Sequence, residues 1–185
     1  GDLGAHALNS LEKYFARVES VWKPVGTEEA FEIVRRRLFE SPGERAQVEG
    51  ISRQFSDFYR QHADKFPVET QSNEYFERLC ASYPIHPEIF DRLYEDWSTL
   101  EKFQRTRGVL QYMAIVIHRL WNSDNKDALI MPGSLPLEDS NVRHKSIHYL
   151  PQGWEPVIER EVDGPRSAPY DIDGHHSLFG GVQAA

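Results

Sequence analysis

The stretch that decides the fold runs from Tyr83 to Trp121 and reads YPIHPEIFDRLYEDWSTLEKFQRTRGVLQYMAIVIHRLW. It predicts two helices joined by a short basic turn. The first helix begins at Pro87, because proline is favoured at the first helical position, where its missing N–H would have no partner. Its apolar side chains recur at helical spacing and predict one broad buried face, made of Ile89, Phe90, Leu93, Tyr94 and Trp97.

The second helix of this stretch is predicted to run from about Thr106 or Arg107 to Trp121. It is apolar on nearly every side, and a helix of this kind belongs at the centre of a domain. We therefore expect it to be buried. Its apolar residues are Val109, Leu110, Met113, Ala114, Ile115, Val116, Ile117, Leu120 and Trp121.

Two arginines, Arg105 and Arg107, stand where this second helix begins. The positive end of the helix dipole disfavours a cation there by about 0.3–1 kcal/mol, so another interaction must offset that cost. A bound phosphate would do so, because backbone N–H groups, the dipole and guanidinium groups all favour it. Alternatively, the two arginines pair with nearby acids such as Asp96 or Glu101, or point into solvent, as many surface cations do.

Composition narrows the class of protein. The chain has 185 residues, of which 39% are hydrophobic and 12% aromatic, so it is long enough to bury a core as one domain. A net charge of -8 argues against a surface built mainly to bind DNA or RNA. A single cysteine, Cys80, excludes an internal disulfide and fits a reducing compartment, so we expect a cytoplasmic protein.

No apolar run approaches the roughly 20 residues that cross a bilayer, and no signal peptide is apparent, so no membrane partner is expected. Because the chain begins with Gly1 rather than Met and stops at Ala185 without a closing element, we expect it to be a piece of a longer protein.

The chain as a whole predicts a mainly α fold, a multi-helix bundle with a short strand or two and an irregular C-terminal region. The other predicted elements are a helix over Leu3–Phe15, a short strand within 18–25, a helix from Thr27 to near Ser41, a long helix from Glu44 to about Lys65, a helix capped by Asn73, a brief strand within 128–131, a helix capped by Asp139 or Ser140, a helix over 154–162, and an ordered loop or tail over 163–185.

Several side chains in these elements have predicted positions. The helix at 44–65 is expected to bury Val48, Ile51, Phe55, Phe58 and His62 and to be interrupted only by Gly50. The triple arginine of residues 35–37 falls in the last turns of its helix, where cations complement the dipole, and we interpret it as a solvated face.

No complete catalytic set is present. The sequence lacks a P-loop, a G-x-G-x-x-G turn, an H-E-x-x-H helix, a paired-cysteine motif and a nucleophile elbow. The histidines suggest structural roles or weak metal ligands: His86 starts a helix, His118 is expected as a core imidazole, His144 and His148 share one face without a third ligand, and His175 and His176 lie near Asp171 and Asp173. We therefore expect neither catalysis by this chain alone nor a metal site.

Five segments occur in an order that resembles a known family: LEKYFARVESVWKPV, EEAFEIVRRRLF, YPIHPEIFDRLYEDW, FQRTRGVLQYMAIVIHRLW and LIMPGSLPLEDSNVR. The family consists of large prokaryotic ATP-binding proteins of unknown function that carry an AAA+-like P-loop core and are often encoded beside restriction or phage-defence systems. The resemblance covers roughly the first 160 residues. The family's nucleotide-binding Walker motifs would lie before Gly1.

The resemblance implies three parts: residues 1–26 as the end of an ATPase core, residues 27–121 as a helical lid, and residues 122–185 as a mixed downstream region. ATP with Mg would be the cofactor of the full-length parent, and none is expected in the fragment. The implied partners are the upstream remainder of the ATPase core and further copies of the parent. Nucleic acid is also conceivable for the parent, although the charge does not indicate it.

The resemblance also implies roles for three arginines. Arg17, after the last core helix, would be an arginine finger that faces the nucleotide of a neighbouring subunit. Arg107, and Arg105 second, would sense the phosphates of the same subunit, with Gly108 allowing close approach. A guanidinium stabilises the charge that spreads over phosphate oxygens during transfer. The expected function is therefore the lid of an ATPase that moves a partner.

The alternative is a helical module that never contacts nucleotide. It would bind a protein partner through the surfaces of Trp97, Trp121 and Trp154, because large exposed apolar patches mark such sites.

Overall fold

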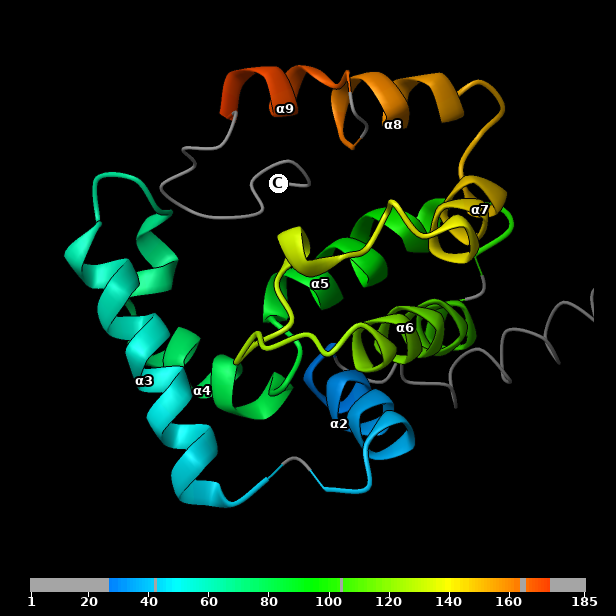
Figure 1. Ribbon diagram of the computed structural model, residues 1–185. Coiled ribbons are helices and arrows are strands. Elements are labelled where there is room, and N and C mark those ends of the chain that lie inside the picture. The colour runs from blue at the N-terminus through cyan, green and yellow to red at the C-terminus, as the bar shows by residue number, and fades with distance from the viewer. Residues whose placement is uncertain (1–26, 42, 104, 164–165, 174–185) are drawn as a thin grey trace, which may run out of the picture.

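The computed structural model describes residues 27–41, 43–103, 105–163 and 166–173, and this part of the chain is mainly helical (Figure 1). The mainly α fold class is confirmed. The elements are α2 (Thr27–Leu38), α3 (Arg45–Gln61), η1 (Val68–Gln71), α4 (Asn73–Ser82), α5 (Pro87–Asp91), η2 (Arg92–Asp96), η3 (Trp97–Thr99), α6 (Arg105–Asn122), η4 (Pro132–Ser134), α7 (Ser140–Tyr149), α8 (Glu155–Glu161) and α9 (Ala168–Asp173). The helix predicted over Leu3–Phe15 and the strand predicted after it lie outside the described residues.

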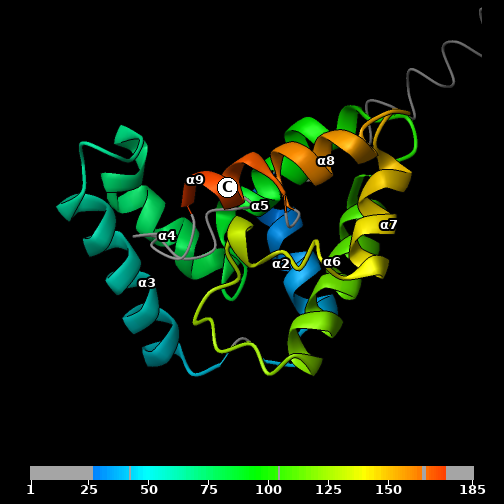
Figure 2. The ribbon, with the colours of Figure 1, turned by 45° about the horizontal axis from the view of Figure 1, so that its top comes forward.

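Helix α6 lies at the centre of the arrangement and packs against α2, α7 and η2. Helix α2 also packs against α4 and α5, while α3 lies at the edge of the molecule and packs against α4 and η1 (Figures 1 and 2). Helices α8 and α9 contact each other and lie on the other side of α5 from α2 (Figure 1). Helices α2 and α6 each pack against three other elements, including each other, and so connect α4 and α5 with α7 and η2.

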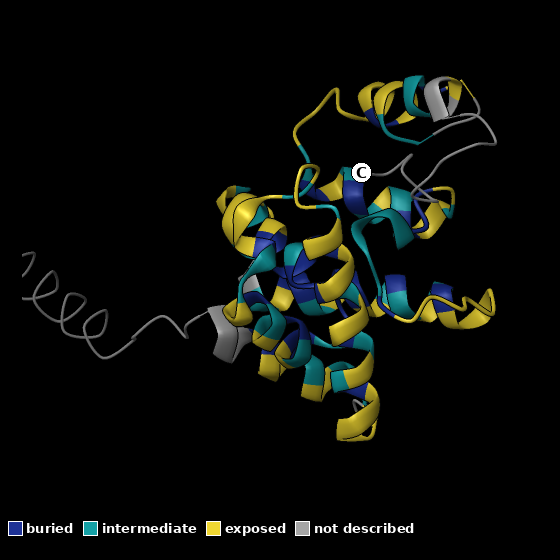
Figure 3. Ribbon diagram, turned by 90° about the vertical axis from the view of Figure 1, so that its left-hand side faces the viewer, coloured by how far each residue is buried: buried dark blue, intermediate teal, exposed yellow. Residues whose placement is uncertain are grey.

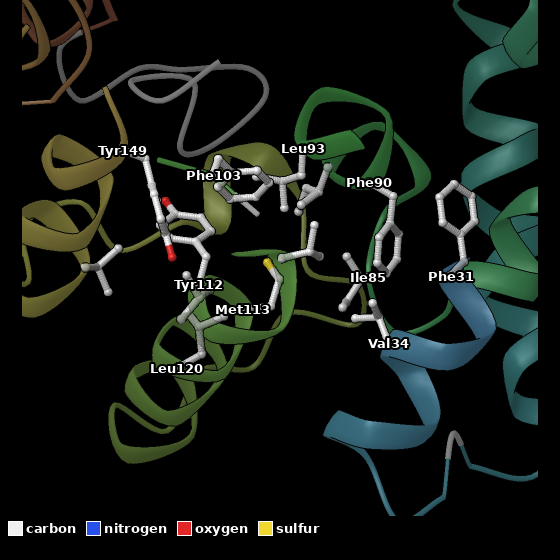
Figure 4. Packing of buried hydrophobic residues seen from close by; sticks show 14 of the residues in the cluster. Phe31, Val34, Ile85, Phe90, Leu93, Phe103, Tyr112, Met113, Leu120 and Tyr149 are labelled. Atoms are coloured by element: carbon white, nitrogen blue, oxygen red, sulfur yellow. The ribbon is translucent and has the colours of Figure 1, made fainter. Parts of the chain in front are cut away.

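One large apolar cluster holds most of these elements together. Phe31 of α2 stacks on Phe90 of α5 with ring centroids 4.5 Å apart, and Ile85 lies between Phe90 and Met113 of α6 (Figure 4). The buried members are Phe31, Val34, Ile85, Ile89, Phe90, Leu93, Phe103, Val109, Tyr112, Met113, Val116, Leu120, Leu137, Val142 and Tyr149. Residues before and after Trp121 therefore share one core, and the predicted division of the chain at 121/122 stays a prediction.

The first helix of the deciding stretch begins at Pro87, as predicted, and continues beyond α5 as the π-helical turn η2 and the 3-10 turn η3. Its expected buried face is largely confirmed. Ile89, Phe90 and Leu93 are buried, while Tyr94 and Trp97 are half-buried and pack against the same cluster.

Helix α6 is less completely buried than its composition predicts. Val109, Met113 and Val116 are fully buried, but Ala114 is exposed and Trp121 is 85% exposed. The expectation of a helix enclosed on all sides is therefore wrong. Its neighbours α2, α7 and η2 cover only part of its surface. Figure 3 shows the same pattern over the molecule, with buried residues between the helices and exposed residues on their outer faces.

Helix α3 was predicted to bury Val48, Ile51, Phe55, Phe58 and His62. This is correct for Val48, correct in part for the half-buried Ile51, Phe55 and His62, and wrong for Phe58. The buried residues are Val48, Ser52, Ser56 and Tyr59, whereas Phe58 is 37% exposed. A helix packs most closely on a neighbour where its side chains are small, and the serines provide that line of contact. The larger rings are displaced to the flanks, where Phe58 contacts His62 and Phe66, and Phe55 contacts Tyr59.

The polar caps at the helix ends follow local sequence signals. Asp139 caps α7, because its Oδ1 accepts hydrogen bonds from the N–H groups of Asn141 and Val142, at 2.9 and 3.2 Å. Helix α4 is capped by Ser72, whose Oγ accepts from the N–H of Tyr75 at 3.1 Å, so the predicted cap at Asn73 is one residue late.

Two other expectations need correction. Instead of a strand at 128–131, Ile130 makes a single parallel bridge with Ile85, through hydrogen bonds from His86 N–H to Ile130 O and from Ile130 N–H to Pro84 O. Within the predicted tail, residues 168–173 form the helix α9 rather than a loop. The bridge between Ile85 and Ile130 does not extend into a longer strand pair, because the chain turns into η4 at Pro132.

Candidate functional site

The start of α6 is where the sequence predicts a phosphate site. Arg105 is the first residue of α6 and Arg107 lies in its first turn, which contains no acidic residue. A Cβ atom added to Gly108 would lie 2.9 Å from the ring of Phe103. Gly108 is therefore explained by the close packing of Phe103, and the helix start is fixed in position by that contact.

The surroundings of Arg107 bear on the two alternatives drawn from the sequence. Its side chain is exposed, and within the described residues it makes no ion pair. Asp96, one of the acids proposed to neutralise it, instead binds Arg92, with 2.8 Å between Nη1 and Oδ2. No ion pair joins Arg107 to Glu101 among the residues described. Pairing with these acids is thus not observed. The exposed guanidinium agrees with a side chain that points into solvent, and it is also available to an anion.

An aromatic platform supports the beginning of α6. The Phe103 ring makes edge contacts with Trp97 and Tyr149, with centroids 5.6 and 4.9 Å apart. Tyr112 contacts Trp97 at 5.2 Å, and its hydroxyl lies 3.0 Å from Ser146 Oγ. Four rings from η3, α6, α7 and the intervening loop therefore hold the first turn of the helix in a defined place.

A second cation lies along the same edge of α6. Gln111 follows Arg107 by one turn, and its Oε1 accepts from Lys145 Nζ at 3.4 Å and from Tyr149 Oη at 3.3 Å. Residues four apart on a helix are neighbours, so Gln111 lies between the two cations. Lys145 also covers the Tyr149 ring at 4.8 Å. Sequence reasoning missed Lys145, because it reaches α6 from a helix more than thirty residues later.

A buried polar contact joins α3 to the start of α5. Tyr59 Oη and His86 Nε2 are 2.9 Å apart, and His86 is only 5% exposed. His86 Nδ1 accepts the backbone N–H of Glu88 at 3.2 Å, so the proton of the neutral ring belongs on Nε2, which donates to Tyr59. Burial, assisted by the Arg78 charge, lowers the pKa of His86 to about 4. The predicted helix-start role of His86 is confirmed.

An ion pair lies beside this contact. Arg78 Nη2 donates to both carboxylate oxygens of Asp91, at 2.7 and 2.8 Å, and ties α4 to α5. The guanidinium also lies 5.9 Å from the centre of the Phe31 ring and 5.8 Å from that of Tyr75. Because both charges already have partners, this pair serves packing between helices rather than ligand binding.

The other predicted site residues have mixed outcomes. Arg17 lies outside the described residues, and so does the side chain of Arg105. His118 is exposed and contacts Asn122, so its assignment to the core is wrong. His144 and His148 are exposed, and His175 and His176 are not described. In the described ranges, no group of three or more His, Cys, Asp or Glu residues is arranged to hold a metal ion.

The three tryptophans of the alternative hypothesis also separate. Trp97 belongs to the aromatic platform, while Trp121 and Trp154 are 85% and 46% exposed.

Among the described helices, none combines the length and the apolar character needed to span a bilayer. In the last turn of α2, Arg36 and Arg37 are exposed and Arg36 pairs with Glu32, in agreement with a solvated face. The prediction is wrong for Arg35, which is half-buried and whose Nε is buried without a partner in the described part of the chain.

Comparison with known proteins places this arrangement in a family. Residues 26–162 match the family model described as the DUF499 second domain. The chain belongs to this family. The DUF499 match begins one residue before α2 and ends one residue after α8, so it includes the start of α6 and the platform beneath it. Searches among curated proteins and among solved structures found no match.

Proposed function

We propose that this DUF499 second domain is the helical lid of an AAA+-like ATPase, and that Arg107 binds the phosphates of ATP held by the preceding domain. The observation that carries the proposal is the exposed Arg107 in the first turn of α6, without an acidic partner among the described residues. The description of the family as a second domain supports a preceding unit. ATP with Mg would be the cofactor of the full-length protein.

The chain's own residues fit an anionic ligand. The first N–H groups of a helix have no intrahelical acceptor, and they lie at its N-terminus, where the helix dipole also places a partial positive charge. Both features favour an anion there. Arg107 adds a planar fork of donors, and Lys145 adds a second cation one helical turn away, beside Gln111. The platform of Trp97, Phe103, Tyr112 and Tyr149 keeps these groups in place before the ligand arrives.

The same proposal assigns the remaining arginines. Arg105 is a second phosphate contact at the helix start, and Arg17 reaches the nucleotide of a neighbouring subunit in a homo-oligomer. Hydrolysis would then be coupled to movement of a partner, for which nucleic acid is one candidate. The full-length protein would act in phage defence. These assignments rest on the family resemblance and on the general need for cations around a transferred phosphoryl group.

The test is ATP hydrolysis by the full-length protein carrying Arg107→Ala. Loss of a preorganised donor to the developing charge is expected to lower kcat by about 100-fold or more. Arg107→Lys should restore only part of the rate, because an ammonium lacks the fork. Arg45→Ala is the matched control: Arg45 also begins a long helix and is exposed, but it pairs with Glu49 at 2.7 Å. Hydrolysis by the Arg107→Ala protein at the unmodified rate would refute the assignment.

A second function is favoured by a different observation. Trp121 is 85% exposed, which is unusual for so large an apolar side chain and fits a module that binds a protein partner. Recovery of a stoichiometric partner that is lost with Trp121→Ser, together with no effect of nucleotide on the intact protein, would decide for this function over the first.

A further inference from the structure

Acidic residues are distributed unevenly over this chain. It has 29 Asp and Glu residues and a net charge of -8, yet neither α6 nor the neighbouring α7 contains one. Residues 102–123 and 140–154 form two runs without an acid, and together they contain six Lys and Arg residues. These runs contribute +6, so the rest of the chain contributes -14 to the total of -8. An acidic chain thus gathers positive charge around two helices that pack against each other.

Helices α6 and α7 lie side by side and present one surface along the line where they meet (Figure 2). They are antiparallel, because Tyr112 Oη lies 3.0 Å from Ser146 Oγ, whereas Arg119, later in α6, meets Asp139 at the start of α7. One side of this line carries side chains that are mostly polar. We call six of them the α6–α7 face: Gln111, His118 and Trp121 of α6, and Asn141, Lys145 and His148 of α7. Lys145 is half-buried and the other five are exposed.

The α6–α7 face is continuous from one helix to the other. Gln111 and His118 lie about 20° apart around the axis of α6, and Trp121 lies about 60° from His118. On α7, the other two residues of the face lie within about 60° of Lys145. The two helices are joined across the line of contact by Lys145 Nζ, which donates to Gln111 Oε1 at 3.4 Å.

The charge of Lys145 is not neutralised by a carboxylate in the described ranges. Its two contacts are the neutral amide of Gln111 and the ring of Tyr149, whose centroid lies 4.8 Å from Nζ. Asp139, the acid that precedes α7, instead pairs with Arg119, with 3.2 Å between Oδ2 and Nε. The ammonium group is therefore held in place and remains open to an anionic ligand.

Trp121 adds an exposed aromatic ring to the same face. Its side chain is 85% exposed, which is unusual for so large an apolar group. Positive charge beside an exposed aromatic ring is the combination that binds single-stranded nucleic acid, because phosphates meet the cations and bases stack on the ring. A single strand offers unstacked bases, whereas a duplex keeps its base faces covered. The chemistry of the face therefore favours a single strand.

We propose that the α6–α7 face binds single-stranded nucleic acid, with Lys145 on backbone phosphates and Trp121 stacked on a base. Gln111, which contacts Lys145, lies about 15 Å from Trp121 along α6, a distance that about four or five nucleotides cover. The amide and imidazole groups between them supply hydrogen bonds to phosphates and sugars. Binding requires neither ATP nor Arg107, so this inference goes beyond the proposed nucleotide role and can fail separately from it.

Fluorescence anisotropy of labelled oligothymidine and oligouridine tests the proposal, with the 185-residue chain at low salt and without ATP. At least one of the two strands should bind. Trp121→Ser should raise Kd about 5–100-fold through the loss of one stacked base, and Trp121→Phe should raise it less, because a phenyl ring also stacks. Since Trp121 is exposed, its replacement removes no core packing, and circular dichroism checks that each variant is folded.

Trp154→Ser is the matched control for the aromatic ring. Trp154 is 46% exposed but lies outside the α6–α7 face and is followed by Glu155, the first residue of α8. Its replacement should leave Kd unchanged.

The salt dependence of binding tests the role of Lys145. Lys145→Ala should lower the slope of log Kd against log salt concentration by about 0.7, the value for one phosphate contact on a single strand. Lys126→Ala is the matched control, because Lys126 is exposed and pairs with Asp124 at 2.9 Å, and the slope should not change.

Four results would overturn the proposal. They are no binding of either strand at low salt, an unchanged Kd in the Trp121→Ser protein, an unchanged slope in the Lys145→Ala protein, and equal affinity for a duplex of the same length. An unchanged Kd together with a protein partner that is lost with Trp121→Ser would assign the exposed ring to the second function described above.

Discussion

Helices α3 and α6 begin alike but are held in the molecule by different means. They have 17 and 18 residues, and neither has an acidic residue in its first turn although each begins with arginine. The buried face of α6 is formed by Val109, Met113 and Val116, which enter the large cluster. The buried face of α3 instead contains Ser52 and Ser56, whose hydroxyls find no partner in the described part of the chain.

The difference shows that length and amphipathic pattern do not determine how strongly a helix is anchored. Helix α6 gains its stability from apolar burial at the centre, where each buried side chain contributes about 1.5–3 kcal/mol. Helix α3 lies at the edge and depends on close approach to α4, on ring contacts, and on the hydrogen bond between Tyr59 and His86. We therefore expect substitutions in the two helices to change the free energy of unfolding by different amounts, with different signs and with a different dependence on pH.

The largest contrast is expected in the buried faces. Met113→Ala should lower the free energy of unfolding by about 2–5 kcal/mol, because it opens a cavity in the main cluster. Ser52→Ala in α3 should change it by less than about 1 kcal/mol and can be stabilising, since a buried hydroxyl without a partner carries a desolvation cost. Urea unfolding followed by circular dichroism measures both. Equal losses in the two variants would show that α3 is anchored as α6 is.

The next effect concerns acid and the attachment of α3. The pKa of His86 falls from 6.5 to about 4 on folding, so the unfolded chain binds the proton more tightly. The stabilisation is complete above pH 6.5 and is lost as the pH falls toward 4, by about 3 kcal/mol in total.

His86→Asn provides the control for this titration. Asparagine keeps an acceptor for the N–H of Glu88 but does not titrate, so this part of the pH dependence should disappear. Unfolding free energies at pH 7, 5.5 and 4.5 give the comparison. The idea fails if both proteins lose the same free energy of unfolding between pH 7 and 4.5, because the titrating group would then be another.

The smallest contrast is expected at one glycine in each helix. Gly108→Ala should cost about 1–3 kcal/mol, because its Cβ would approach the Phe103 ring to 2.9 Å. Gly50→Ala should instead stabilise the protein by about 0.5–1 kcal/mol, since nothing lies within 4 Å of the added atom. Melting temperatures that shift in opposite directions would support this; shifts of the same sign would not.

Local signals in the sequence were sufficient for much of the fold. Pro87 and Asp139 mark helix starts through chemistry confined to a few neighbouring residues, and both predictions are confirmed. The buried side of α3 was predicted only in part: Val48 is buried as expected, but Ser52 and Ser56 are buried in place of Phe58, because hydropathy ranks phenylalanine above serine while the contact with α4 favours small side chains. His118 was placed in the core for a related reason, since its neighbours in sequence are apolar.

The candidate site shows the same limit. The position of Arg107 at the start of α6 follows from the local pattern, and its role as a phosphate contact stays a prediction. Lys145, beside Gln111, and Tyr59, beside His86, come from distant parts of the chain. The spacing of residues within one segment does not reveal such contacts, because they depend on how the helices cross in space.

The bridge between Ile85 and Ile130 has a mechanical consequence for α6. The segment that follows α6 is fastened by two backbone hydrogen bonds just ahead of α5, while the start of α6 meets η2 through the 3.4 Å contact from Tyr94 Oη to Thr106 Oγ1. The start of α6 and the segment that follows α6 thus both attach to one stretch of the chain, from Pro84 to Tyr94. A movement of this stretch therefore reaches α6 by two routes, directly at Thr106 and through the connection 123–129 that follows its last turn.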